Sequence, residues 1–457
     1  MSDSSPVRDA LLRHALQAAV PETARRAAAI FLEDSIMVGL AGSATPERAR
    51  LVAAAGHWSP AGPARLWGDG HPHSTATAAL INAYQIHCQE FDCVHEPAVV
   101  HPMAVVGAAL LAWAQARGPV RGRDLLDAIC VAVDGATVLG MMARTPMRFF
   151  RPAMCGALGA SLGLSRLAGL DETDARTALG LTYCQISGNM QSHVEGTPGL
   201  ALQIGVNARA AVSSAELAMA GMSGPIDVLD GPFGYLELIE DNYDTAPLEI
   251  LGKTWQIDEV SHKPFPTGRA AHATLDGLGR LLADGLAAED IARIELYAPP
   301  LIRRLIDRPA LPDMSASYAR LCLPWLVSVQ LARGAVGLED FDAAALRDST
   351  RWARVGDLVI RPDDNSDPNA LVPQHLAVTT RDGRVHDVGL PQVLGSPARP
   401  LDEPARTAKA KACWRFAGVD DERGTRLLNE ARKNSQSYDI EAIFSLLTPA
   451  ATPARNH

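Results

Sequence analysis

Long runs of small and apolar residues in the first half of the chain place the strongest constraint on its fold. Three of them are "HPMAVVGAALLAWAQARG" (101–118), "GRDLLDAICVAVDGATVLGMMA" (122–143) and "CGALGASLGLSRLAGL" (155–170). Each run spans several helical turns and is apolar around nearly all of its circumference. Because such a helix must be buried on every side, the runs predict helices packed between other layers of helices.

The composition of the chain supports the same interpretation. Hydrophobic residues make up 47% of the 457 residues, but aromatic residues make up only 5%. Many alanines and few aromatic side chains favour closely packed helices over a β-sandwich. Further helical patterns lie at 22–42, 75–92, 171–190 and 207–224, and Asp171 precedes one of them as a predicted N-cap.

The pattern changes near Leu251. Residues 292–299, "ARIELYAP", alternate like a strand, and residues 355–364 do so less cleanly. Residues 374–391 read as a hairpin that turns at Asp382-Gly383. Helical patterns at 269–285 and 317–334 lie between these strands, so the segment from Lys253 to about Pro400 predicts an α+β unit. After a Pro-rich linker the chain returns to helix.

The charge and the cysteines exclude several functional classes. The formal net charge is −10, which repels phosphate backbones, so we expect no nucleic acid partner. The seven cysteines form no C-x-x-C pair and lie mostly in apolar stretches. We therefore expect neither a disulfide framework nor a zinc or iron–sulfur site, and we predict a reducing, cytoplasmic compartment.

A membrane location is also not expected. The stretch closest to a membrane span is 98–116, but it begins with a histidine and a proline and is rich in alanine. A buried helix is the preferred interpretation. The first twenty residues carry acids and lack a continuous apolar core, so we do not expect a secretory signal there.

Three segments concentrate polar side chains in apolar surroundings. In the first, Asp92 and His95 lie in an expected loop, and His101 precedes Pro102 at the start of a helix. The free N–H groups of a helix start suit an anion. We interpret the stretch as a catalytic corner; the alternative is that Asp92 is a cap and His101 an ordinary buried polar residue.

The second segment is "SHKPFPTGRAAHATLDG" (261–277). Two prolines stiffen the backbone after Lys263, and Arg269 and His272 are three residues apart at a helix start. Two cations and a histidine on one face would hold a carboxylate, which arginine binds through two hydrogen bonds. The alternative is a solvated helix start with a surface lysine.

The third segment, "MRFFRPAMCGALG", places Arg148 and Arg151 before a Gly-rich helix. Arg151 could direct an acid-binding guanidinium into the core, although the sequence alone favours a surface salt bridge. His193 and Glu195 occur in a loop further along, and the sequence gives no independent reason to assign them to catalysis.

Taken in order, these segments resemble motifs of the MmgE/PrpD family, which comprises 2-methylcitrate dehydratases, cis-aconitate decarboxylases and iminodisuccinate epimerases. "EFDCVH" and "HPMAV" resemble D-F-D-D-T-H and H-P-S-A-V, and "RPAMCGALGAS" is similar to H-P-T-A-T-C-G-A-x-G-A-A. "HKPFPTGRAAHATLDG" resembles K-P-Y-P-x-C-R-x-x-H-x-x-I-D, and "GAVGLEDF" resembles G-x-V-G-L-E-D-F. The resemblance runs from about residue 20 to 445.

The resemblance implies a mostly α fold: a large all-helical domain built from both chain ends (1–252 and 401–457) and an inserted α+β lid domain (253–400). It implies a homodimer, no metal, no organic cofactor and a site between the domains. The residues that match the family motifs are Asp92, His95, His101, Lys263, Arg269 and His272. The positions that depart from them are Glu90, Cys93, Val94, Arg151, Leu200 and Trp325.

The chemistry shared by such sites is removal of a proton from a carbon next to a carboxylate. We expect a hydro-lyase acting on a small di- or tricarboxylic acid, with His101 as base or acid and Lys263 as charge stabiliser or partner acid. Arg269, with His272 and Arg151, would anchor a carboxylate, and Asp92 would orient a neighbouring histidine. The alternatives are a dicarboxylate epimerase, a decarboxylase, and a dimeric ligand-binding scaffold without turnover.

Overall fold

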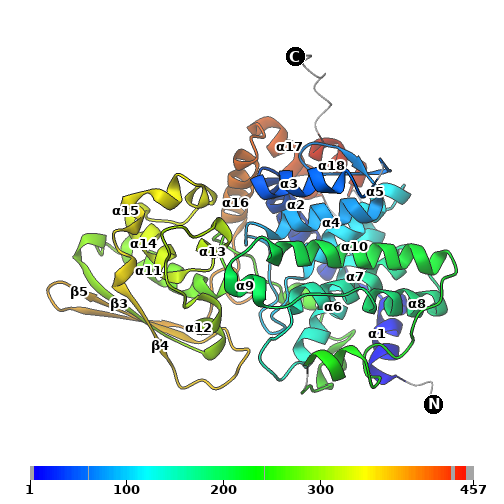
Figure 1. Ribbon diagram of the computed structural model, residues 1–457, viewed down its shortest axis with the longest axis horizontal. Helices are drawn as coiled ribbons and strands as arrows, with labels where there is room; N and C mark the ends of the chain where they lie inside the picture. Colours follow the sequence, from blue (N-terminus) through cyan, green and yellow to red (C-terminus); the bar gives the residue numbers. More distant parts are fainter. Residues whose placement is uncertain (1–4, 60, 241, 434–437, 449–457) are drawn as a thin grey trace.

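Long, closely packed helices form the larger part of the protein, and a smaller unit with a sheet lies against one end of them (Figure 1). The computed structural model describes residues 5–59, 61–240, 242–433 and 438–448. The helices of the larger part are α1 (Pro6–Gln17), α2 (Glu22–Ser43), α3 (Pro46–Ala55), α4 (Thr75–His87), α5 (Pro102–Arg117), α6 (Gly122–Met142), α7 (Arg151–Leu167), α8 (Glu172–Tyr183), α9 (Gln191–Glu195) and α10 (Gly199–Met219).

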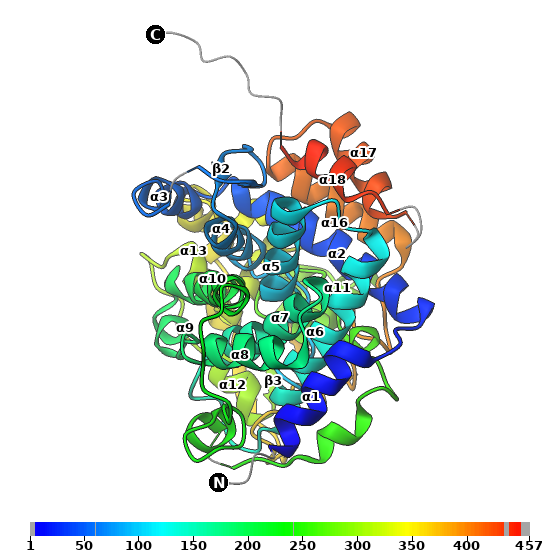
Figure 2. The same cartoon turned by 90° about the vertical axis from the view of Figure 1, so that its right-hand side faces the viewer.

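Helices α5 and α7 lie at the centre of this bundle. They contact each other and are surrounded by α2, α4, α6, α8 and α10, an arrangement visible in the view along the bundle (Figure 2). The three apolar runs of the sequence form α5, α6 and α7, so the predicted layers of buried helices are confirmed. A short hairpin of β1 (Ala64–Arg65) and β2 (Pro72–His73) precedes α4.

The smaller unit is an α+β structure around a four-stranded sheet. The strands β3 (Ile291–Ala298), β4 (Leu358–Pro362), β5 (Gln374–Thr380) and β6 (Val385–Leu390) follow the order β4-β3-β5-β6. β3 pairs parallel with β4, whereas β5 pairs antiparallel with β3 and β6. Its helices are α11 (His272–Ala283), α12 (Pro300–Ile306), α13 (Ala316–Ala319), α14 (Leu323–Arg333) and α15 (Ser349–Trp352). The predicted hairpin is confirmed, and Gly383 adopts the positive φ of 88° that its turn requires.

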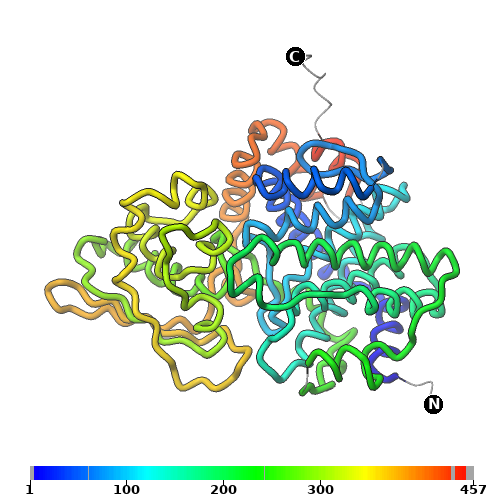
Figure 3. The backbone as a smooth tube through the Cα atoms, viewed as in Figure 1, coloured from blue at the N-terminus to red at the C-terminus, as the bar shows by residue number. Residues whose placement is uncertain are grey.

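After the sheet the chain returns to the helical part (Figure 3). α16 (Glu403–Phe416) packs on α2, and α17 (Asp421–Ala431) and α18 (Ile440–Leu447) follow it. The buried ammonium of Lys409 lies 2.6 Å from the carboxylate of Asp34 and donates to the carbonyl oxygen of Phe91. The return helix is thus tied both to the first helices and to the loop between α4 and α5. The domain boundaries at 252/253 and 400/401 stay a prediction.

Several element ends differ from the sequence prediction. The helix expected over 75–92 ends at His87, and Glu90 just beyond it has a φ of 50° that no right-handed helix contains. The helix expected over 317–334 is divided into α13 and α14, with Pro324 in the first turn of α14. Asp171 caps α8 as predicted, because its carboxylate accepts from the Asp174 N–H at 2.9 Å.

The most membrane-like helix of the described chain is α6, not the stretch at 98–116. Helix α6 is long and apolar enough to cross a bilayer, but 89% of its apolar window is buried inside the protein. Stretch 98–116 largely forms α5, which is buried between its neighbours as expected. Both helices therefore contribute to the core.

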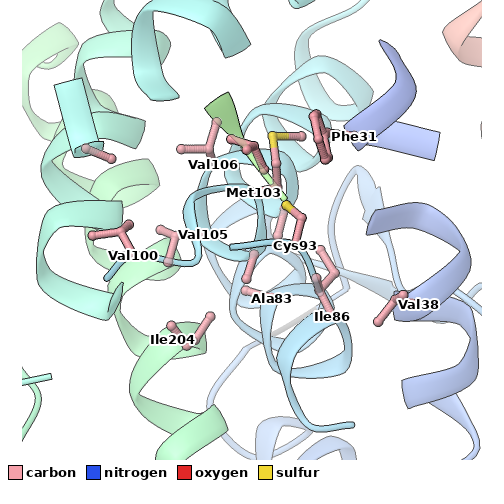
Figure 4. Packing of buried hydrophobic residues seen from close by; sticks show 14 of the residues in the cluster. Phe31, Val38, Ala83, Ile86, Cys93, Val100, Met103, Val105, Val106 and Ile204 are labelled. Carbon is pink, nitrogen blue, oxygen red and sulfur yellow. The ribbon is translucent and has the colours of Figure 1, made fainter. Parts of the chain in front are cut away.

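The loop between α4 and α5 passes through this core. Figure 4 labels Cys93 and Val100 of the loop among the buried hydrophobic residues of the core. Cys93 and Val100 are fully buried. A loop enclosed in this way has a fixed backbone, and it carries the first of the three polar segments.

Candidate active site

Backbone hydrogen bonds join the α4–α5 loop to the start of the smaller unit. The N–H of Val94 donates to the carbonyl oxygen of Ser261 at 3.0 Å, and the N–H of Ser261 donates back at 2.8 Å. A second pair of backbone bonds closes the loop between His95 and Val100. These bonds place Lys263, two residues beyond Ser261, beside the acids of the loop.

Asp92 is the centre of a buried charge cluster. Its Oδ2 accepts hydrogen bonds from Nδ1 of His87 and from Nδ1 of His101, each at 3.0 Å. Nζ of Lys263 lies 3.8 Å from Asp92 Oδ1 and donates to Glu90 Oε2 at 2.9 Å and to the Glu90 carbonyl oxygen at 3.2 Å. Asp92 and Lys263 are fully buried, so these charges act on one another with little screening by water.

The cations of the cluster keep both acids ionised. Burial alone would raise the pKa of Asp92, but the charges of His87, His101 and Lys263 outweigh it and hold the pKa well below the ordinary value. Burial opposes ionisation of Glu90 in the same way, but Lys263 and the two histidines lower the pKa of Glu90 to about 2. Two carboxylates therefore remain charged within the core.

The same surroundings push the two histidines in opposite directions. Burial alone would lower the pKa of His87, but the carboxylates of Asp92 and Glu90 outweigh it and raise that pKa above its ordinary value. Burial is the largest influence on His101 and lowers its pKa; Asp92 raises that pKa, but not enough to offset burial together with the smaller lowering effects of Lys263 and His87. A pair of groups separated in this way is suited to act as acid and base.

A cavity of about 60 Å³ lies next to the cluster, between the helical part and the smaller unit. Its polar lining consists of His87, Glu90, His101, His193 and Arg269. Asp92 and Lys263 are not in the lining and lie one layer behind it. The ammonium of Lys263 donates to Glu90, which is in the lining, so Lys263 contacts the cavity wall only indirectly, and its expected catalytic role stays a prediction.

The rest of the cavity wall is largely apolar. The helical part contributes Val94, Val99, Met147, Phe150, Pro152, Met190 and Leu200, and the smaller unit contributes Leu305, Ile306, Leu321 and Leu371. Sites for small molecules commonly measure several hundred Å³, so this cavity is small for a substrate in the present arrangement. Leu371 also borders a wider crevice of about 720 Å³ that adjoins the cavity.

Backbone strain coincides with this cavity. Among the residues that the structure describes, Glu90 and Val99 are the only ones other than glycine with a positive φ, at 50° and 52°. Both line the cavity. A β-branched residue such as valine rarely adopts this conformation, and such strain occurs where a site fixes it. The strain therefore makes the α4–α5 loop a candidate functional segment.

Two predicted site histidines are turned away from the cavity. Nε2 of His95 is 3.1 Å from Gln256 Oε1, and its Nδ1 accepts from the Ala98 N–H at 3.2 Å. Both ring nitrogens thus have partners, and burial lowers the pKa of His95 to about 4. His272 is fully buried with Nε2 on the carbonyl oxygen of Thr267. Both rings help to shape the fold around the site.

The predicted arginines already bind acids of the protein itself. Arg269 lines the cavity, but its Nε and Nη2 donate to Glu96 Oε1 at 3.1 and 2.6 Å, and its Nη1 donates to two backbone carbonyl oxygens. Arg151 lies outside the cavity wall and forms a two-bond pair with Glu240. Neither guanidinium is free to anchor a substrate in this arrangement, because a buried acid takes its paired donors.

Sequence reasoning did not assign His87, Glu90 or His193 to the site. His87 lies in the last turn of α4, five residues before Asp92, where a helical pattern alone predicts one more buried position. His193 lies in the short helix α9 and reaches the cavity only through the packing of α9 near α10. For His87 and Glu90 the sequence contains one usable signal, a histidine and two acids within six residues.

His87, Asp92 and His101 also place one possible metal-ligand atom each within 4.8 Å of one another. Cation binding there is opposed by the ammonium of Lys263, which already neutralises the acids. Both Nδ1 atoms are at hydrogen-bond distance from Asp92, and a hydrogen-bonded cluster accounts for the geometry. The expectation of a metal-free site stays a prediction.

Comparison with known proteins connects this site to a family. The MmgE/PrpD N-terminal domain model matches residues 13–247, and the MmgE/PrpD C-terminal domain model matches residues 265–433. A cis-aconitate decarboxylase-like protein, oryM, of Aspergillus oryzae is 24% identical, covering 94% of each chain. The cis-aconitate decarboxylase of Homo sapiens is 28% identical over 76% of this chain and 74% of its own, and that of Mus musculus is 26% identical over 81% and 78%. The two domain models together match most of the chain, including His87, Asp92 and His101, and the chain therefore belongs to the MmgE/PrpD family.

Proposed function

We propose that the protein is an enzyme that removes a proton from a carbon next to a carboxylate of its substrate. The observation that supports this most strongly is the pair of Asp92 and His101 at the cavity wall. Nδ1 of His101 donates to Asp92, and Nε2 makes no hydrogen bond with any residue that the structure describes. A neutral imidazole held in this tautomer has its Nε2 lone pair free to act as a base.

The other charged groups would support this base. Asp92 fixes the His101 ring and stabilises the imidazolium that proton removal creates. His87, whose pKa is raised, also borders the cavity and is suited to donate a proton or to stabilise an enediolate-like anion. Lys263 acts through Glu90 and Asp92 and is a positioning residue rather than a group that touches the substrate.

The reaction that follows proton removal is a lyase reaction in our proposal. A hydro-lyase would use an acid such as His87 to protonate the departing hydroxyl. The relatives carry the name cis-aconitate decarboxylase or cis-aconitate decarboxylase-like, so a carboxy-lyase is an equal candidate. In that reaction no C–H proton is removed first: the bond to the carboxylate breaks, carbon dioxide leaves, and the carbanion takes a proton from an acid such as His87. An epimerase would need a second base on the opposite face of the substrate.

Incubation of the protein with a panel of carboxylic acids in deuterated water, followed by NMR, tests this proposal. We expect deuterium at the carbon next to a carboxylate together with loss of water or carbon dioxide. Exchange with inversion and no net loss would indicate an epimerase. Absence of exchange with every acid would contradict the proposed function and favour the ligand-binding scaffold.

A further inference from the structure

We propose that the cavity takes an acid with one carboxylate and an apolar body, rather than a tricarboxylic acid. This inference rests on the proposed function and narrows its substrate class. It depends on three observations: the apolar wall, the pairing of Arg269 and Lys263 with acids of the chain, and the contact of Arg308 with the lining residue His193.

The wall offers little to a second or third carboxylate. Leu200 and Val94 both line the cavity and offer a carboxylate neither a charge nor a side-chain hydrogen bond. Phe150, Ile306 and Leu371 add apolar surface from both parts of the protein. Apolar side chains of this kind stabilise a hydrocarbon body by excluding water from it.

The cations at the near side are neutralised by acids of the chain. Arg269 is paired with Glu96, and Lys263 is paired with Glu90 next to Asp92. The neighbouring arginines are also engaged: Arg304 donates to the carbonyl oxygen of Met147, and Arg320 donates to Gln89 and to the carbonyl oxygen of Pro266. A further carboxylate placed beside these pairs would be desolvated without a counter-charge, which is costly.

His193 and Arg308 form the pair that we assign to binding the single carboxylate of the substrate. Nη2 of Arg308 is 3.3 Å from Nδ1 of His193 and 3.0 Å from the His193 carbonyl oxygen, so this nitrogen of the ring accepts. The proton of neutral His193 is then on Nε2, and the ring borders the cavity. Nη1 of Arg308 is buried and has no hydrogen-bond partner among the described residues. Arg308 therefore has a positive charge without an acid partner in the described part of the chain, next to the ring of His193. The Nε2–H of His193 could donate to one substrate carboxylate, and the charge of Arg308 would stabilise it.

Isothermal titration calorimetry with matched acids tests the inference without requiring turnover. The probes are butanoate, hexanoate and octanoate, with succinate and propane-1,2,3-tricarboxylate as the polar series. We expect affinity to rise by about fourfold for each added methylene until the cavity is filled. We expect hexanoate to bind at least about tenfold more tightly than either polycarboxylate.

Three variants test which residues set the preference for a monocarboxylate with an apolar body. Leu200→Lys adds an ammonium to the wall, and we expect it to strengthen succinate binding by about tenfold and to weaken hexanoate binding. The matched control is Leu202→Lys on the same helix, since Leu202 is 38% exposed and lies outside the cavity lining. Arg308→Gln should weaken hexanoate binding by about tenfold, and thermal unfolding of each variant checks that it is folded.

The possible results separate this inference from the proposed function. If propane-1,2,3-tricarboxylate binds the wild type as tightly as hexanoate or more so, or if no acid binds, the inference is wrong. Hexanoate binding that responds to Leu200→Lys, without deuterium exchange for any acid, would support the inference and contradict the proposed function. Exchange confined to tricarboxylates would support the function and overturn the inference.

Discussion

At the scale of the residue, the site depends on two histidines that share one acceptor. His87 and His101 both donate to Asp92 Oδ2, but Glu90 lies 3.6 Å from the second ring nitrogen of His87. The extra carboxylate favours the protonated form of His87, whereas Lys263 disfavours that of His101. One buried carboxylate thus accepts hydrogen bonds from two rings whose pKa values are shifted in opposite directions.

The first prediction compares His101, which lines the cavity, with His95, which was assigned to the site from the sequence motif alone. His101→Asn should lower the rate of deuterium exchange by about a hundredfold or more, because it removes the base. His95→Asn should leave the exchange rate within a few fold of the wild type once its thermal stability is taken into account, because His95 bonds Gln256 away from the cavity. Equal losses in the two variants would contradict this assignment.

The second prediction concerns pH. His101 must be neutral to act as a base, so kcat/KM falls as the pH falls through its pKa. The charge of Lys263 lowers that pKa, and Lys263→Met should therefore raise it and move the acidic limb of the pH profile upward by roughly one pH unit. Lys263→Arg keeps the charge and should keep the limb in place. If the acidic limb of the kcat/KM profile stays in place in Lys263→Met, the charge of Lys263 does not affect the pKa of His101, and the prediction is wrong.

The third prediction concerns metals. His87, Asp92 and His101 have atoms close enough to bind a cation, but Lys263 already supplies the positive charge there. We expect the exchange rate to survive exhaustive chelation followed by gel filtration. Elemental analysis of the same sample provides the control. Loss of the rate, with recovery upon addition of one particular metal, would overturn the expectation.

At the scale of the element, the close contact of α6 and α7 depends on glycine. A Cβ on Gly159 of α7 would lie 2.3 Å from the carbonyl oxygen of Ala132 in α6, which is far inside van der Waals contact. The helices at the centre of the bundle can therefore lie side by side only because this position has no side chain. The wall of the cavity formed by Phe150 and Pro152, at the start of α7, is positioned by this contact.

The fourth prediction tests that contact with a matched pair of substitutions. Gly159→Ala should lower the free energy of unfolding by at least about 2 kcal/mol, since the backbone of α6 must move. Gly107→Ala in α5 should be neutral or stabilising by up to about 1 kcal/mol, because a Cβ there meets only Met103 and Leu32 at 3.6 and 3.8 Å. Urea denaturation followed by circular dichroism measures both; similar free energies for the two variants would refute the packing argument.

At the scale of the whole molecule, the smaller unit closes the site that the helical part begins. Glu90, His101 and His193 come from the helical part, whereas Arg269 and Leu371 come from the smaller unit. The cavity exists only where the two parts meet. A chain that folded its helical bundle alone would retain Asp92 and His101 but would lack the wall that excludes water from them.

The fifth prediction is a homodimer, which the family resemblance implies. Large apolar side chains are exposed between the end of α10 and residue 238, among them Phe233 at 75% and Met222 at 51% exposure. We expect sedimentation at twice the chain mass, and we expect Phe233→Glu to shift the protein toward monomer. Val385→Glu on β6, where the side chain is 62% exposed, is the control and should sediment like the wild type. A monomeric wild type would contradict the prediction.

The sequence by itself determined the elements and most of their order. Apolar runs with helical spacing predict α5, α6 and α7, and the alternating pattern before Asp382-Gly383 predicts the β5–β6 hairpin, because these signals depend on neighbouring residues. The break near Leu251 is readable for the same reason. Two predicted helices were wrong in their extent. The helix expected over 317–334 is divided, with Pro324 at the start of its second part, and the helix expected over 75–92 ends before Glu90, which has a positive φ.

Only the tertiary structure decided which polar residues share the cavity. His193 and His101 are distant in sequence and meet through the packing of α9, α10 and α5, whereas His95 belongs to the same motif as Asp92 and points elsewhere. Sequence spacing cannot show that Glu96 forms an ion pair with Arg269 or that Glu90 forms one with Lys263. Ion pairs form between segments brought together by burial, so the charges available to a substrate follow from the folded arrangement.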